Sequence, residues 1–472
     1  MNLFTSRARM AAALLLPFLA TAADAVNPVE IRFAQLRGDP PSLYAFLLRM
    51  PKGGDLHNHV SGAVYAESYL HAAAVDGLCA NLRTGAIVAP GNAPDNNGGC
   101  GDNVPAARAE SDNGLRNSLI DSLSMRNFVA GRESAHDHFF AAFGKFGPWK
   151  DEHHGEFLAE VTRRAADQNE SYLELMGMNC HAANEVGNKA GFDENFDHTR
   201  DQLTAAGLDT VVRQMRTRIV ELEQGRRAAL GCDSHPESPA CQVTVRYILE
   251  VLRESPKEQV FAQTMAGFRL ASMEPLVVGI NFVQAEDGFV SMRDYSLHMR
   301  MVGYARRQYP KVHVSLHAGE LAPGLTPPDG LRFHVREAVD VAGAERIGHG
   351  VDILCETGSR ALLERMRQRH ILVEINLTSN DLILGVRGSE HPLPAYRRAG
   401  VPVAISTDDE GVARSHLTAE FLRAVLTYKL SYADVKEMVR NSLRYAFVDE
   451  TAKAQLQTDL EARFRDFEQS ER

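Results

Sequence analysis

The chain has 472 residues, of which 44% are hydrophobic and 24% are charged, and its formal net charge is −10 at pH 7. These values are typical of a globular protein that holds one large domain or two medium ones. Nucleic acids and anionic membrane surfaces are bound through basic surfaces, so the acidic balance argues against both as partners.

An export signal is predicted at the start of the chain. Arg7 and Arg9 precede an apolar run over residues 10–20, and Ala23-Asp24-Ala25 places small residues where a signal peptidase cleaves. The run is too short for a membrane anchor, and a buried first helix is the alternative. We therefore expect a signal peptide over residues 1–25 and a mature protein beginning near Val26. Such a protein would be periplasmic or secreted, without further membrane attachment.

The six cysteines fit an oxidising compartment. Two pairs bracket short polar or glycine-rich stretches, Cys79 with Cys100 and Cys232 with Cys241, and each pair could form a local disulfide. Sequence alone does not determine the connectivity. Cys180 and Cys355 are expected to be free. No CxxC is present, so a cysteine-based zinc site is not predicted.

Helical patterns cover residues 26–50, 116–168 and 194–230, while residues 81–115 look like an insertion that forms a loop or lid rim. Eight apolar segments are predicted as strands: residues 55–59, 171–176, 243–249, 275–282, 312–317, 346–350, 371–376 and 401–409, the last running into a loop.

Strands that alternate with helices indicate a parallel sheet, and eight such units favour a closed (β/α)8 TIM barrel of the α/β class. We expect one barrel domain over residues 26–472, with extra N-terminal helices and insertions near 81–115 and 225–242. An open doubly wound sheet is the alternative. No GxGxxG motif follows the first strand, which weakens a dinucleotide-binding version of that sheet.

Polar side chains stand at the ends of several predicted strands. In residues 312–320 the alternation puts His317 on the polar face of a strand, with Glu320 just beyond it. His57 and His59 are two residues apart and face the same way on a strand, whereas His136 and His138 fall in a helical pattern and are interpreted as helix surface.

His349 ends the sixth strand, and Asp408 and Asp409 follow the eighth. Strand ends meet at one mouth of a barrel, where three imidazoles and a carboxylate can bind zinc or iron and leave a position for water. Each residue alone has an ordinary alternative: a core histidine, a turn at His349, a solvated Glu320, or a helix N-cap at the two aspartates.

Four segments, residues 51–63, 315–320, 346–350 and 406–409, resemble the signature segments of the adenosine deaminase family within the metal-dependent amidohydrolases. The likeness continues through residues 430–447, with Asn441-Ser442. The exported form with its insertion is similar to the secreted adenosine deaminase-related growth factor branch.

The resemblance implies a role for each residue. His57, His59, His317 and Asp408 would bind one Zn²⁺, which lowers the pKa of its water. His349 would orient and support the resulting hydroxide. Glu320 would protonate the purine ring nitrogen next to the reacting carbon, and Asp409 would hydrogen-bond the ring nitrogen on the imidazole side.

The substrate end departs from the family pattern. Ser61 stands where the family usually has an aspartate that reaches the ribose, Gln284 stands for a glycine that contacts the purine, and Asn281 replaces an aspartate. The predicted substrate contacts are Ser61, Gly279, Gln284 and Asp409. We expect hydrolysis of adenosine and 2'-deoxyadenosine to inosine and 2'-deoxyinosine with release of ammonia. A modified adenosine or another 6-aminopurine compound is the alternative.

Three rival functions are considered. Two-metal amidohydrolases bridge their ions with a Lys or Glu of the fourth strand, but residues 277–282 contain neither, which favours a single ion. The cytidine-deaminase zinc site needs HxE with PCxxC, and His235-Pro236-Glu237 lacks the second half. An extracellular binding or signalling protein that keeps the fold without turnover is the third. The oligomeric state is left open, a homodimer included.

Overall fold

The computed structural model describes residues 28–91, 99–131 and 133–471, so the predicted signal peptide lies outside the described residues. Eight parallel strands form the central sheet: β1 (Gly54–His59), β5 (Tyr172–Asn179), β6 (Thr244–Leu252), β7 (Val277–Val283), β8 (His313–Ala318), β9 (Arg346–His349), β10 (Leu372–Ile375) and β11 (Val403–Ile405). Neighbours along the sheet are also consecutive in this order.

The sheet closes on itself at the C-terminal ends of its first and last strands. His59 N donates to Asp408 O at 3.1 Å, and Asp408 N donates to His57 O at 2.8 Å, in a parallel bridge between Asn58 and Asp408. The predicted (β/α)8 barrel is therefore confirmed. All residues of β1, β9, β10 and β11 are buried, because a barrel strand faces a packed interior on one side and helices on the other.

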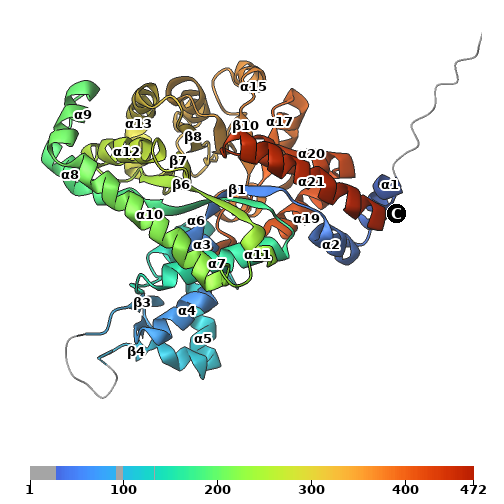
Figure 1. The fold of residues 1–472 in the computed structure, drawn as a ribbon, viewed down its shortest axis with the longest axis horizontal. Helices are drawn as coiled ribbons and strands as arrows, with labels where there is room; N and C mark the ends of the chain where they lie inside the picture. Colours follow the sequence, from blue (N-terminus) through green and yellow to red (C-terminus); the bar gives the residue numbers. More distant parts are fainter. Residues whose placement is uncertain (1–27, 92–98, 132, 472) are drawn as a thin grey trace, which may run out of the picture.

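Helices surround the barrel between successive strands (Figure 1). They include α7 (His153–Asp167), α10 (Leu208–Leu230), α12 (Lys257–Ala271), α13 (Phe289–Gln308), α15 (Ser359–Gln368), α17 (Leu393–Ala399) and α20 (Tyr432–Arg444). The predicted helix over 194–230 is broken at Gly207, whose φ of 107° interrupts the helix, into α9 (Phe196–Ala205) and α10.

The extra N-terminal helices, α1 (Pro28–Leu36) and α2 (Pro40–Arg49), pack beside α20 and the C-terminal helix α21 (Glu450–Ser470). Phe46 anchors this contact, with its ring centroid 5.4 Å from Phe33, 6.0 Å from Tyr432 and 5.0 Å from Phe467. The two ends of the described chain thus meet at one side of the barrel (Figure 1).

The insertion after β1 is more regular than the sequence indicated. Residues 81–115 are not a plain loop: β2 (Cys79–Asn81), β3 (Ala86–Val88) and β4 (Val104–Pro105) form a small antiparallel sheet, and α5 (Asn113–Ser122) follows. Strands of two or three residues are too short to show an alternating pattern, which is why the prediction was wrong. The predicted Cys79–Cys100 disulfide joins this sheet to the loop before β4.

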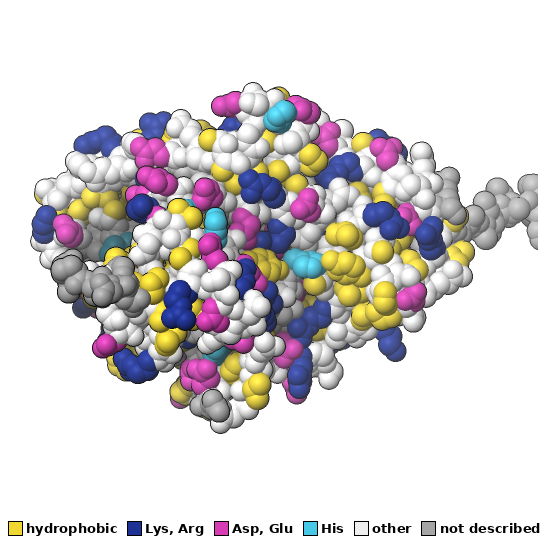
Figure 2. All heavy atoms as spheres, turned by 90° about the horizontal axis from the view of Figure 1, so that it is seen from below, with side chains coloured by type: hydrophobic (Ala, Val, Ile, Leu, Met, Phe, Trp, Pro, Cys, Tyr) yellow, Lys and Arg dark blue, Asp and Glu magenta, His cyan; other side chains and the backbone are white. Residues whose placement is uncertain are grey.

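The second predicted disulfide, Cys232–Cys241, closes the loop between α10 and α11 (Pro239–Gln242), and Cys180 and Cys355 are free as expected. In the described part of the chain, no helix combines the length and apolar character needed to cross a membrane. Figure 2 shows acidic and basic side chains mixed over one face of the molecule, without a broad area of positive charge.

Candidate active site

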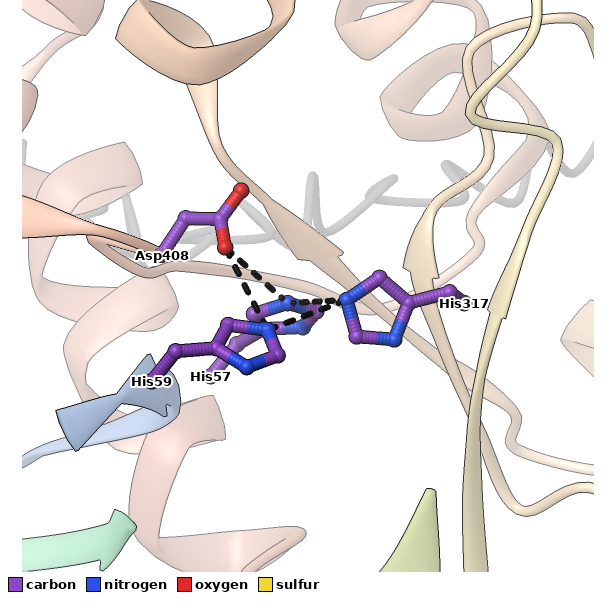
Figure 3. Close-up of side chains that lie close together, drawn as sticks. All are labelled: His57, His59, His317 and Asp408. Carbon is purple, nitrogen blue, oxygen red and sulfur yellow. Dashed lines mark hydrogen bonds and ion pairs between the residues drawn. The ribbon is translucent and has the colours of Figure 1, made fainter. Parts of the chain in front are cut away.

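Four predicted ligands converge at the C-terminal mouth of the barrel (Figure 3). His57 and His59 come from β1, His317 from β8, and Asp408 follows β11. His317 Nε2 lies 3.1 Å from Nε2 of both His57 and His59, and Asp408 Oδ1 lies 3.6 and 3.5 Å from the same two nitrogens. All four side chains are buried, so the structure brings together residues up to 351 positions apart in sequence (408 minus 57).

The orientation of His57 is fixed from behind by a carboxylate. Its Nδ1 lies 2.7 Å from Glu374 Oε2, which can only accept, so Nδ1 carries a proton and Nε2 faces the other ligands. Ser315 Oγ donates to Glu374 Oε1 at 2.9 Å, and Arg346 Nε pairs with the same oxygen at 2.7 Å. The guanidinium balances the negative charge that this buried site would otherwise contain.

The other two histidines follow the same pattern. His59 Nδ1 lies 3.3 Å from Glu250 Oε1, and His317 Nδ1 lies 2.9 Å from Asn281 Oδ1. The amide oxygen of Asn281 can therefore accept a hydrogen bond from His317 Nδ1, as a carboxylate does for the other two histidines. This contact is kept although the family usually has an aspartate at this position. All three Nε2 atoms point at one position.

These residues fit a zinc ion. With Zn–N bonds of about 2.0–2.1 Å in a tetrahedron, ligand atoms are about 3.3 Å apart, close to the separations found here. Burial, followed by the neighbouring His57, keeps the pKa of His317 well below its ordinary value, so its lone pair is available. For His57, burial opposes a charge, but Asp408 and Glu374 outweigh it and raise its pKa to about 10. A metal ion bound here would therefore have to displace a proton from His57 Nε2.

Two carboxyl groups beside this cluster have unpartnered buried oxygens, Glu320 Oε1 and Asp409 Oδ1. Burial, then the charge of Asp408, raises the pKa of Glu320 and of Asp409 well above the ordinary values. Asp409 precedes α18 (Glu410–Ala413), but its side chain makes no capping bond, so the N-cap alternative fails. Both oxygens are free to bind a ligand.

Glu320 is held through its backbone. Glu286 accepts hydrogen bonds from Gly319 N at 3.0 Å and Glu320 N at 2.8 Å, and His334 Nδ1 lies 2.6 Å from it. Burial opposes ionisation of Glu286, but His334 and Arg253 outweigh it and lower its pKa. The loop after β8 is thus fixed by an ionised carboxylate that the sequence analysis did not identify.

His349 ends β9, fully buried, and does lie in a tight turn between two glycines, in which Gly350 N donates to Gly348 O at 3.0 Å. Its Nε2 lies 3.7 Å from Asp408 Oδ2, and its Nδ1 lies 3.5 Å from Glu320 Oε1. Burial lowers its pKa to about 3, so the ring is neutral.

Backbone strain collects at the same mouth. Gln284, His349 and Asp408 have φ values of 81°, 69° and 62°, a region that non-glycine residues rarely adopt. Each such residue costs about 1–3 kcal/mol and persists only where its surroundings impose it, typically at functional sites.

The site opens into a cavity of about 410 Å³. Three of the predicted substrate contacts, Ser61, Gln284 and Asp409, line it, together with Phe139, Phe140 and Phe143 of α6 (Ala135–Phe143) and with Asn179, Glu250 and Glu254. His136 and His138 belong to that helix, as expected, and not to the ligand cluster.

The expectation for Gly279 is corrected by the structure. Gly279 is not among the residues that line the cavity; a Cβ at this position would meet His313 O at 3.0 Å and Phe447 Cδ2 at 3.2 Å. It lies near the start of β7, whereas the mouth is formed by residues after the end of that strand.

Sequence reasoning missed Glu250, which lines the cavity and contacts His59, and four residues that act from behind the site: Glu286, Glu374, Ser379 and Asn380. Ser379 Oγ donates to Asp408 Oδ2 at 2.6 Å, and Asn380 Nδ2 lies 2.8 Å from His349 Nδ1. A signal existed for Glu374, the only charged residue in the apolar segment 371–375, because a lone charge in a buried strand requires a partner.

Comparison with known proteins places this site in a family. The sequence profile described as adenosine deaminase matches residues 222–463, just over half of the chain (242 of 472). The chain therefore belongs to the adenosine deaminase family. The match contains His317, Glu320 and Asp408, whereas His57 and His59 precede it and join it only in the fold.

Two relatives carry different activity names. An adenine deaminase of Rhizobium johnstonii is 30% identical over 264 residues, which is 53% of this chain and 74% of that protein. An adenosine deaminase of Vibrio vulnificus is 28% identical over 213 residues, 44% of this chain and 58% of that protein. Both relatives are purine deaminases, and their names differ in the purine on which they act.

Solved structures share the fold. An adenine deaminase from Arthrobacter aurescens has a TM-score of 0.56 at 18% identity, over 87% of this chain and 98% of that one. The N6-methyl-AMP deaminase from Arabidopsis thaliana has a TM-score of 0.57 at 20% identity, over 89% of this chain and 98% of that one. An amidohydrolase from Burkholderia ambifaria with bound Zn has a TM-score of 0.55 at 17% identity, over 91% of this chain and 94% of that one.

Proposed function

We propose that this protein is a zinc-dependent enzyme that hydrolyses the 6-amino group of adenosine and 2'-deoxyadenosine, giving inosine and 2'-deoxyinosine and releasing ammonia. The observation that carries the proposal is the convergence of four metal-binding side chains beside two carboxyl groups with free oxygens in one cavity. Membership of the deaminase family supports the same reaction class.

Zinc is the proposed ion, supported by the three nitrogen donors and one oxygen donor and by the zinc in the Burkholderia ambifaria structure. When bound, it would lower the pKa of a water molecule so that hydroxide is available near neutral pH. The chain's own contribution is to hold three Nε2 lone pairs and Asp408 Oδ1 around one position.

Glu320 is the proposed proton donor. A carboxyl group donates only while it is protonated, and burial beside Asp408 raises the pKa of Glu320, which favours its protonated form. Its free Oε1 can give this proton to the purine ring nitrogen next to the reacting carbon. That carbon then becomes more electrophilic, and the oxygen of a water molecule adds to it. Of the two protons of this water, one leaves with the amino group as ammonia when the C–N bond breaks, and the other restores the Glu320 carboxyl.

Asp409 and His349 would position the reactants. Asp409 Oδ1 is unpartnered in the cavity wall, where it can form a hydrogen bond with the ring nitrogen on the imidazole side of the purine. His349 lies between Glu320 and Asp408, where it can orient the attacking oxygen. Gln284 and Ser61 remain the proposed contacts for the rest of the substrate.

The charge of the cavity favours an unphosphorylated substrate. None of the described residues that line it is a lysine or arginine, while Glu250 and Glu254 join the three carboxyl groups of the centre. Phosphate recognition uses cationic side chains or free backbone amides, so a nucleotide such as N6-methyl-AMP fits poorly. Ser61, Asn179 and Gln284 offer partners for sugar hydroxyls, which favours a nucleoside. The free base adenine is the second candidate, favoured by the name of the 30% identical relative.

A substrate panel tests the proposal. Purified zinc-loaded protein is mixed with adenosine, 2'-deoxyadenosine, N6-methyladenosine, adenine and AMP, and ammonia is measured. The proposal expects release from the nucleosides, little from AMP, and none in a Glu320→Gln variant that retains its zinc. Zinc-loaded protein that releases no ammonia from any of them would instead support the binding role without turnover.

We also propose that the protein is exported. Two disulfides are consistent with an oxidising compartment, and residues 1–25 have the pattern of a cleavable signal peptide. Expression of the full chain in a bacterial host, followed by fractionation and N-terminal sequencing, tests this. If the protein is exported, we expect periplasmic or secreted protein that begins near Val26. Uncleaved protein in the cytoplasm would contradict the proposal.

A further inference from the structure

A line of buried hydrogen bonds reaches His349 from outside the cavity wall. The backbone nitrogen of Leu393 donates to His391 Nδ1 at 3.1 Å, and His391 Nε2 lies 3.1 Å from Asn380 Oδ1. Asn380 Nδ2 in turn lies 2.8 Å from His349 Nδ1. His349, Asn380 and His391 are all buried, so water does not substitute for any member of this line.

The direction of every bond follows from its outer end. A backbone N–H can only donate, so His391 Nδ1 must accept and carries a lone pair. Burial lowers the pKa of His391 to about 4, so at neutral pH the ring has one proton, which must be on Nε2. His391 Nε2–H therefore donates to the amide oxygen of Asn380.

The amide of Asn380 transmits this direction to the active site. With its oxygen turned toward His391, its NH2 group faces His349, and His349 Nδ1 must accept. We propose that Asn380 and His391 are positioning residues that hold His349 with a lone pair on Nδ1 and its proton on Nε2. Neither residue touches the cavity, and neither is a metal ligand.

This tautomer would have a role in the proposed deaminase reaction, and that role rests on the proposed function. His349 Nε2 is the nitrogen that faces Asp408, at 3.7 Å from Oδ2, so its N–H points toward the metal-binding cluster. On the other side, Nδ1 lies 3.5 Å from Glu320 Oε1 but has no proton to give it. The Glu320 oxygen therefore stays available to the substrate.

The Asp408 carboxylate lies beyond hydrogen-bonding distance of Nε2, and its charge favours a proton on this same nitrogen. Asn376 Nδ2 is 3.5 Å from both ring nitrogens of His349, a distance at the limit of a hydrogen bond and equal for the two atoms. Asn376 therefore packs against the ring without distinguishing one nitrogen from the other.

The tautomer can be read directly by ¹⁵N NMR of protein labelled at histidine. The His349 signals are assigned by their loss in a His349→Gln variant, and the protonated nitrogen is identified by its coupling to the ring protons. The proposal expects a proton on Nε2 alone. A proton on Nδ1, or on both nitrogens, at neutral pH would overturn it. This readout needs no turnover, so it remains decisive if the protein proves not to be a deaminase.

Two amide substitutions at His391 test the role in catalysis. His391→Gln keeps an N–H donor near the position of Nε2, whereas His391→Asn, one methylene shorter, does not reach Asn380. We expect His391→Asn to lower kcat about 10- to 100-fold, with KM and zinc content nearly unchanged, and His391→Gln to stay within about threefold of the wild type.

Equal kcat values for the two variants, or a loss confined to KM, would contradict the proposal. If His391→Asn does not fold, Asn380→Ala breaks the line one step further on, because it removes the NH2 group that donates to His349 Nδ1, and it is expected to lower kcat to a similar extent. Wild-type protein without any turnover would refute the proposed function, while the ¹⁵N measurement would still decide the tautomer.

Discussion

Replacing Gly62 by alanine should displace the Asp409 carboxylate. Gly62 lies in the short helix α3 (Val60–Ala63), directly against the Asp409 side chain. A Cβ at this position would lie 1.7 Å from Asp409 Oδ1 and 2.4 Å from its Cγ, distances that real side chains do not adopt. The absence of a side chain at Gly62 is therefore what lets Asp409 occupy its place in the cavity wall.

The size of the effect follows from these distances. Ordinary van der Waals contact begins at 3.4 Å, so the carboxylate oxygen must move by about 1.7 Å, the difference between 3.4 and 1.7. A misplacement of about 1 Å can reduce catalysis about 100-fold. We therefore expect kcat/KM for adenosine to fall at least about 100-fold, which corresponds to about 2.7 kcal/mol of transition-state stabilisation.

Steady-state kinetics and zinc analysis of Gly62→Ala check this prediction. Gly38→Ala is the matched control, because its Cβ would lie 3.6 Å from Gln35 O, an ordinary contact, and it should keep full activity. Zinc content should remain at the wild-type level, since Asp409 is not a ligand. Folded Gly62→Ala protein with kcat/KM within about threefold of the wild type, or with its zinc lost, would refute the reasoning.

Two further predictions concern residues around the mouth. Glu286→Gln offers one acceptor oxygen in place of two to the backbone of Gly319 and Glu320, so kcat should fall about tenfold at unchanged zinc content; an unchanged kcat would contradict the positioning role. His136 Nε2 lies 3.2 Å from Asp287 Oδ1, and this bond raises the pKa of His136 against the effect of burial, which lowers it. The His136–Asp287 pair therefore stabilises the folded protein fully at a pH below about 6.5, the pKa of histidine in the unfolded chain. This stabilisation disappears as the pH rises through the raised pKa of the folded state. Asp287→Asn should therefore lower Tm by about 1 °C in acidic buffer and not in alkaline buffer; equal losses in both would contradict this.

Much of the fold could be predicted because the barrel strands are short apolar runs with polar residues at one end. Two residues of separation place His57 and His59 on the same face of a strand, and parallel strands bring their C-terminal ends to one mouth. These two rules suffice to bring His317 and Asp408 to the pair. The comparisons support the same family, and the structure places the four ligand atoms within 4.8 Å of one another.

The parts of the site and of the fold that could not be predicted depend on contacts that no local sequence pattern encodes. Glu374, Asn380 and His391 act through partners on other strands and helices, and their roles follow only from which atoms face each other. Gly279 was misplaced because a strand offers several positions, of which only those at its end reach the mouth. The small sheet of the insertion was missed because its strands have at most three residues.

The central claim is that His57, His59, His317 and Asp408 hold one divalent cation that the reaction requires. The most direct measurement is elemental analysis of purified active protein, repeated after chelation and for a His317→Ala variant, with ammonia release from adenosine measured on the same samples. The account predicts about one zinc ion per chain, activity that is lost on chelation and restored by zinc, and neither zinc nor activity in the variant. Full turnover by metal-free protein, or stoichiometric zinc retained without His317, would contradict it.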